Sequence, residues 1–128
     1  MNITRGKVKT AIKMLVYGPE GVGKTTFAAQ MPGAVFIDTE GSTKELDVSR
    51  YPTPQTWNDI VTYVNDFIES MPGKTLVIDT ADWAENLAIA AVCSDLSVKG
   101  IESVGYGKGY VYLAEKFGEL LKRCDVLI

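Results

Sequence analysis

The chain has 128 residues, of which 46% are hydrophobic and 23% charged, so it suits one compact domain with a hydrophobic core. Its formal net charge of -3 argues against binding of polyanions over the whole surface, although a local basic site is compatible with it. Histidine is absent, which excludes His-based catalytic triads and His-containing zinc sites. The two cysteines lie far apart and lack C-x-x-C spacing, which predicts a reduced, cytoplasmic protein.

The N-terminal segment is polar and basic, and it lacks the apolar stretch of a signal peptide. No other window has the apolar length that spans a bilayer, so no membrane association is expected. The arm offers positive charge that could touch nucleic acid, although a solvated lead-in to the first strand is the simpler interpretation. Its basic residues are Arg5, Lys7, Lys9 and Lys13.

In the first half of the chain, short apolar runs alternate with amphipathic segments. Ile12–Tyr17 predicts a buried strand that leads into a glycine-rich turn, and 25–30 predicts a short helix ended by Pro32-Gly33. A second strand is expected over 34–38. The following stretch, 39–54, has little periodicity and reads as a long loop.

The second half continues the alternation. Thr56 and Asp59 resemble a capping box and predict the start of a helix, which is followed by a third strand over 75–79. Another helix is expected over about 83–94, then a glycine-containing loop. A further helix is predicted by an apolar stripe, and a fourth strand by 126–128. The stripe consists of Tyr110, Leu113, Ala114, Phe117, Leu120 and Leu121. This order predicts a single α/β domain over 1–128, with a parallel sheet covered by helices on both faces in three α/β/α layers.

The turn after the first predicted strand satisfies the pattern G-x-x-x-x-G-K-[ST]. Gly18 and Gly23 permit a close approach of the backbone, so that successive N–H groups can surround phosphate oxygens. Lys24 is expected to contact the β- and γ-phosphates and to act in catalysis, and Thr25 to offer its hydroxyl to Mg²⁺. The predicted ligand is ATP, and the residues predicted to bind it are Gly18, Pro19, Glu20, Gly21, Val22, Gly23, Lys24, Thr25 and Thr26.

The third predicted strand ends in Asp79, which fits a Walker B strand. Parallel strands present their carboxyl ends at one edge of the sheet, so Asp79 is predicted to hold Mg²⁺ together with Thr25 and to act in catalysis. The alternative is that Asp79 only caps the following helix.

Hydrolysis also needs a group that orients or deprotonates water. Many ATPases carry a glutamate directly after the Walker B aspartate, but this chain has Thr80 there. Glu40, just past the second strand, is the candidate catalytic carboxylate, while Asp38 is expected to fix the loop by local hydrogen bonds. Asp82 and Glu85 are the reserve candidates, and both could instead stabilise the start of their helix.

The segments 18–26 and 36–40 resemble the RecA-type ATPases, and more closely the compact RecA-like proteins of phages and prophages that are tied to single-strand annealing and recombination. The segments 79–83 and 105–110 are similar to that phage group too. The resemblance implies that Glu40 activates water. It also implies partners such as single-stranded DNA or a single-strand-binding protein, and a location in the bacterial host cell.

RecA-type sheets have the strand order 5-1-4-3-2. The resemblance therefore implies that the strand beginning at Val126 lies between the first and third strands, and that the chain is an N-terminal fragment which hydrolyses ATP weakly. On this interpretation Ile12–Tyr17 has an open edge that favours self-association. The loop 106–110 could contact single-stranded DNA, or its tyrosines could simply pack at a helix start.

Two other function classes remain open. One is a nucleotide-binding interaction module whose ATP state controls assembly with little turnover. The other is a small-molecule P-loop kinase, which would need an arginine-rich lid, whereas arginine occurs only at Arg5, Arg50 and Arg123. No N-K-x-D element is present, which disfavours a GTPase.

Overall fold

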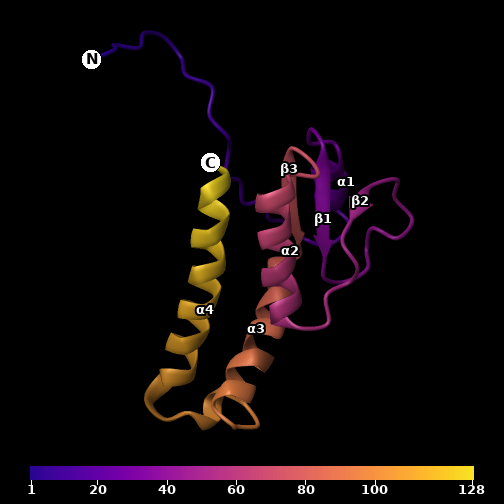
Figure 1. Ribbon diagram of the computed structural model, residues 1–128. Coiled ribbons are helices and arrows are strands. Elements are labelled where there is room, and N and C mark those ends of the chain that lie inside the picture. Colours follow the sequence, from indigo (N-terminus) through magenta and orange to yellow (C-terminus); the bar gives the residue numbers. More distant parts are fainter.

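The computed structural model describes residues 1–128, with the exception of the side chain of Tyr106. The loop predicted over 106–110 therefore lies partly outside the described residues. Figure 1 shows a small parallel sheet beside a group of long helices, with the N-terminal residues extending away from both. The elements are α1 (Lys24–Ala29), β1 (Ala34–Asp38), β2 (Ser49–Arg50), α2 (Trp57–Ser70), β3 (Thr75–Asp79), α3 (Ala81–Asp95), α4 (Lys108–Cys124) and the 3₁₀ turns η1 (Ile101–Ser103), η2 (Gly105–Gly107) and η3 (Asp125–Leu127).

The sheet has the order β2-β1-β3, and both pairs are parallel. The RecA resemblance implies that the second and third predicted strands, 34–38 and 75–79, are neighbours. These strands are β1 and β3 of the structure, and they are adjacent. Their register pairs Ile37 with Ile78 and Asp38 with Asp79. Because the two strands end at the same level, the residues that follow them meet at one edge of the sheet.

The predicted strand over Ile12–Tyr17 is wrong for this structure, since residues 1–19 contain no strand. A strand requires a neighbour to satisfy its backbone hydrogen bonds, and none of the described strands lies beside this segment. Its apolar side chains are exposed, with Ile12 at 75% and Leu15 at 80%.

The predicted fourth strand over 126–128 is also wrong. α4 runs to Cys124 and passes directly into η3, where the amide of Ile128 donates to the carbonyl of Asp125 at 3.1 Å. The Lys13 ammonium forms an ion pair with the Asp125 carboxylate, so the N-terminal arm contacts the end of α4. Since neither predicted strand is present, the edge strands of the sheet are β2 and β3, and Ile12–Tyr17 is not an edge.

A smaller correction concerns the loop predicted over 39–54, which contains the short strand β2. Ser49 and Arg50 pair with Val35 and Phe36 of β1. This pairing brings the far end of the loop back to the sheet. The loop is therefore held at both of its ends.

α2 begins as predicted. The Thr56 hydroxyl accepts a hydrogen bond from the Asp59 amide at 3.1 Å, and the Asp59 carboxylate accepts one from the Thr56 amide at 3.1 Å. These two bonds satisfy backbone donors that the first turn of a helix cannot pair internally. The C-terminal end of α2 is at Ser70, just before Pro72 and Gly73.

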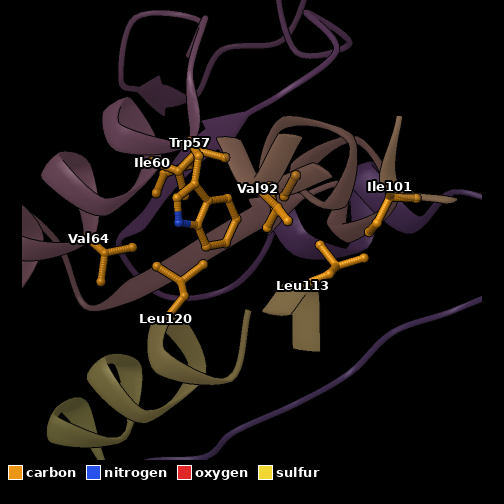
Figure 2. Packing of buried hydrophobic residues seen from close by; sticks show 10 residues of the cluster. Trp57, Ile60, Val64, Val92, Ile101, Leu113 and Leu120 are labelled. Carbon is orange, nitrogen blue, oxygen red and sulfur yellow. The ribbon is translucent and has the colours of Figure 1, made fainter. Parts of the chain in front are cut away.

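The hydrophobic core lies where α2, α3 and α4 pack against each other and against β1. Figure 2 shows the indole of Trp57 surrounded by Ile60, Val92 and Leu120. Its ring contacts Phe117 with a centroid separation of 5.6 Å. By contrast, α1 contains no buried residue, so the well-packed helical layer is α2 to α4. No described helix combines the length and apolar character that crossing a membrane requires.

Gly109, within the Gly105–Tyr110 segment, has a packing role. A Cβ at this position would lie 2.4 Å from the carbonyl oxygen of Ile101, so only glycine lets α4 approach η1 this closely. The Tyr110 hydroxyl donates to Glu102 at 3.2 Å and ties the same two elements together. These contacts of Gly109 and Tyr110 favour the interpretation that the segment packs at a helix start over the one in which it contacts single-stranded DNA.

Candidate nucleotide-binding site

The glycine-rich loop leads directly into α1. Gly23 is the N-cap of α1 and has a φ of 100°, a conformation that residues with a Cβ rarely adopt. The loop residues before Lys24 are exposed to solvent. The Lys24 ammonium turns back over the loop, where it donates to the carbonyl oxygen of Gly18 and, at 3.1 Å, to that of Pro19. Lys24 and the loop backbone were both predicted to bind the phosphates, and in the structure they contact each other.

Thr25 and Asp79 are brought together. The Thr25 hydroxyl donates a hydrogen bond of 2.7 Å to the Asp79 carboxylate, which is 8% exposed. The two residues come from the first turn of α1 and the end of β3, so the contact joins the glycine-rich loop to the carboxyl edge of the sheet. Thr26, the next residue of α1, is exposed.

Two threonines, Thr39 and Thr80, join the ends of β1 and β3. The Thr39 amide donates to the Asp79 carbonyl at 2.8 Å, and the Thr80 amide donates to the Thr39 hydroxyl at 2.8 Å. The Thr39 hydroxyl in turn lies 3.1 Å from the Asp79 carbonyl oxygen and 3.2 Å from that of Thr80. These contacts fix the backbone on both sides of Asp79.

Glu40 lies next to this junction. Its carboxylate accepts a hydrogen bond of 3.2 Å from the Thr80 hydroxyl, while the residue as a whole is exposed. The carboxylate that is expected to activate water therefore bonds to Thr80, the residue that directly follows the candidate metal ligand Asp79. The shared level of the β1 and β3 ends produces this placement.

Asp38 fixes the loop that carries Glu40, as predicted. One carboxylate oxygen accepts from the amides of Glu40, Gly41 and Ser42 at 3.1, 2.8 and 3.2 Å. The other accepts from the Thr43 amide at 2.8 Å and from its hydroxyl at 2.5 Å. Burial opposes ionisation of this side chain, which is 1% exposed, but the hydrogen bonds outweigh it, so the pKa of Asp38 lies below its ordinary value.

Arg50 extends the network from β2. Its guanidinium donates to the Thr43 hydroxyl at 3.0 Å, to the Thr43 carbonyl at 2.7 Å and to the Leu46 carbonyl at 2.8 Å. A planar guanidinium has several donors in a fixed geometry and therefore suits a loop with several free carbonyls. The loop after β1 is held by one buried carboxylate at its start and one arginine at its end.

Sequence reasoning missed Thr39, Thr80 and Arg50. A signal for the threonines was present, because both strands end in Ile-Asp and are followed directly by Thr, at 37–39 and 78–80. In a parallel pair that ends at the same level, this repetition places two hydroxyls beside two strand ends. The two aspartates nevertheless differ, since Asp38 turns to its own loop and Asp79 turns to Thr25.

The reserve candidates lie elsewhere. Asp82 and Glu85, on the first turns of α3, line a cleft of about 330 Å³ between α3 and α4, together with Ala81, Tyr110, Leu113, Ala114 and Phe117. The lining residues that come from α4 are mostly apolar or aromatic. These two residues therefore lie in the cleft between α3 and α4, whereas Glu40 lies at the strand ends beside Thr80.

The side-chain oxygen atoms of Thr25 and Asp79 suit Mg²⁺. Mg²⁺ prefers hard oxygen ligands, and it commonly uses one or two protein groups together with waters and substrate phosphates. The Thr25 hydroxyl and the Asp79 carboxylate supply two such oxygens 2.7 Å apart. Among the residues whose side chains are described, no three His, Cys, Asp or Glu residues gather into a metal-binding group.

Comparison with known proteins gives one match. Residues 10–127 match the family described as an AAA domain (AAA_24), which covers nearly the whole chain. No curated protein and no solved structure shows significant similarity to it. The matched region includes the glycine-rich loop, Glu40 and Asp79. The chain therefore belongs to the AAA domain family, which consists of AAA-type P-loop ATPases.

Proposed function

We propose that the protein binds ATP with Mg²⁺ and hydrolyses it. The observation that carries this proposal is the 2.7 Å hydrogen bond between Thr25 and Asp79, because it brings a hydroxyl and a carboxylate from separate segments to one point beside the glycine-rich loop. In this proposal Thr25 and Asp79 hold Mg²⁺, which when bound neutralises charge on the β- and γ-phosphates. The Gly18–Thr26 segment supplies backbone N–H groups to the same phosphates.

The residues of the chain have separate roles in the reaction. Lys24 exchanges its contacts with the Gly18 and Pro19 carbonyls for phosphate oxygens. Glu40 orients a water molecule toward the γ-phosphorus and accepts its proton. The bond from the γ-phosphorus to the bridging oxygen breaks, and ADP leaves with the electron pair. The products are ADP and inorganic phosphate.

The biological setting is proposed from resemblance. The segments 18–26, 36–40, 79–83 and 105–110 resemble RecA-like proteins of phages that act in recombination or single-strand handling. We therefore propose single-stranded DNA, or a protein that binds it, as the partner. Basic residues of the N-terminal arm, including Lys7 and Lys9, are exposed and offer contacts to phosphates.

Calorimetry and turnover measurements test the proposal. Titration with ATP and with GTP, each with Mg²⁺, is expected to give heat for at least one nucleotide, and Lys24→Ala is expected to abolish it. Lys99→Ala, which removes an exposed lysine from a different loop, serves as the control. Turnover that increases with single-stranded DNA supports the DNA role. No heat from the folded wild type with either nucleotide would refute nucleotide binding.

The exposed apolar run favours a second candidate, a module whose ATP state controls assembly with itself or a partner. Ile12, Leu15 and Tyr17 are 75%, 80% and 88% exposed, which is unusual for three neighbouring large side chains. Leu15→Asp is expected to leave nucleotide binding unchanged and to reduce self-association in light scattering. A wild-type protein that remains monomeric with and without ATP would argue against self-association.

A further inference from the structure

We propose that Thr80 is a positioning residue whose hydroxyl sets the place of the Glu40 carboxylate. The inference rests on the proposed ATPase function and adds a residue to it. Thr80 directly follows Asp79 and is the N-cap of α3. Its side chain therefore lies where the end of β3, the start of α3 and the loop after β1 meet.

The hydroxyl of Thr80 has two described contacts. It donates to a carboxylate oxygen of Glu40 at 3.2 Å and accepts from the Trp83 amide at 3.4 Å. A hydroxyl has one hydrogen to donate and two lone pairs that accept, so both contacts can exist together. The single hydrogen is directed to Glu40, while the helix cap uses a lone pair.

The backbone of Thr80 is held independently of Glu40. Its amide donates to the Thr39 hydroxyl at 2.8 Å, and the Thr39 amide donates to the neighbouring Asp79 carbonyl at 2.8 Å. Because these bonds join β1 to β3, the position from which the Thr80 hydroxyl reaches out is set by the sheet. The donor is therefore preorganised before it meets the carboxylate.

The place of the Glu40 carboxylate depends on the Thr80 hydroxyl, although the Glu40 backbone is fixed by the loop. Its amide is fixed by the Asp38 carboxylate at 3.1 Å, but the side chain beyond it is exposed and has several rotatable bonds. Among the described side chains, the Thr80 hydroxyl is the one hydrogen-bond partner of the Glu40 carboxylate. Removal of this donor leaves the carboxylate free to move away from the strand ends.

The contact also connects Glu40 to α3. The same hydroxyl accepts from the Trp83 amide in the first turn of α3 at 3.4 Å, so Thr80 bonds to both the helix start and Glu40.

The test compares Thr80→Val with Thr80→Ser. Valine keeps the shape of threonine but cannot donate, and it is expected to lower kcat roughly ten- to a hundredfold while KM for ATP changes little. Serine keeps the donor and is expected to retain most of the turnover. Thr75→Val is the matched control, because it removes a hydroxyl that bonds the Pro32 carbonyl at the opposite end of β3.

A double-mutant cycle with Glu40→Gln shows whether Thr80 acts through Glu40. Thr80→Val is expected to cause no further loss of kcat once Glu40 has been replaced. Wild-type turnover in Thr80→Val alongside an inactive Glu40→Gln would overturn this inference and leave the proposed function intact. An equal loss from Thr80→Val in both backgrounds would also overturn it. Absence of turnover in the wild type would instead overturn the proposed hydrolysis, and this inference with it.

Discussion

The Thr25 hydroxyl and the Asp79 carboxylate form a hydrogen bond of 2.7 Å although the residues are 54 positions apart in sequence. Thr25 belongs to a loop and short helix that contribute nothing to the buried core, whereas Asp79 ends a strand of the sheet. Their contact therefore fixes the glycine-rich loop relative to the sheet at one point. When a cation binds both oxygens, the Thr25 hydroxyl keeps its hydrogen but must turn it away from the Asp79 carboxylate.

We expect both partners of this contact to determine how strongly Mg²⁺ enhances ATP binding. Thr25→Ala and Asp79→Asn each remove a ligand oxygen or its charge, and should weaken Mg²⁺-dependent ATP binding about ten- to a hundredfold, as for loss of a charged hydrogen bond. Calorimetric titration with and without Mg²⁺ measures the difference. Thr25→Ser should behave like the wild type, and so should Asp47→Asn, which changes an exposed loop carboxylate. Equal enhancement by Mg²⁺ in Asp79→Asn would exclude Asp79 as a ligand.

Glu40→Gln is expected to separate binding from turnover. The amide keeps the size of the side chain but cannot accept a proton from water, so kcat should fall about 10²- to 10⁴-fold with little change in KM. A steady-state assay of phosphate release provides both constants. Glu45→Gln, in the same loop and also exposed, is the matched control. Unchanged phosphate release in Glu40→Gln would remove this residue from the mechanism.

Features encoded by a few adjacent residues could be predicted from the sequence. The bounds of β1 and β3 were predicted residue for residue from apolar runs that end in aspartate. The Thr56 capping box was found from its spacing, although Asp59 replaces the usual glutamate. The capping bonds join residues three positions apart, and the strand bounds are marked by short apolar runs, although the two strands also need each other as neighbours.

Features that depend on distant partners could not be predicted. The apolar run Ile12–Tyr17 has the composition of a strand, but a strand forms only beside another strand, and here none of the described strands is its neighbour. The contact of Thr80 with Glu40 likewise follows from the register of β1 and β3, which pairs Asp38 with Asp79. Composition indicates which residues can form such contacts, and register decides which of them do.

The capping box of α2 gives a prediction about stability. Thr56→Ala removes the oxygen that accepts from the Asp59 amide at 3.1 Å, so the free energy of unfolding should fall by about 1 kcal/mol. Urea unfolding followed by circular dichroism measures this change. Thr56→Ser should retain most of the stability, and Thr53→Ala, at an exposed position before the helix, should have little effect. A loss no larger than that of Thr53→Ala would show that the cap contributes nothing.

Asp38 should make the stability of the fold sensitive to acid. Five hydrogen bonds of at most 3.2 Å reach its carboxylate from Glu40, Gly41, Ser42 and Thr43. They hold the pKa of Asp38 below its ordinary value in the folded state, against the effect of burial. Asp38→Asn keeps one accepting oxygen but turns an amide group toward the remaining donors. It should lower the free energy of unfolding by about 1–3 kcal/mol at neutral pH.

The pH dependence of the stability distinguishes the effect of the Asp38 charge from a loss of packing. Between the folded and unfolded pKa values the unfolded chain holds a proton at Asp38 that the folded chain does not, so acidification favours unfolding. The contribution is complete above about pH 3.9, the ordinary value for aspartate, and is lost as the pH falls through the folded value. The pKa of Asp59 is also lowered, chiefly by the Gln55 amide, but this group is unchanged in the variant. Urea unfolding from pH 6 downward should therefore show a shallower acid loss for Asp38→Asn than for the wild type or Asp47→Asn, and parallel curves would contradict the assignment.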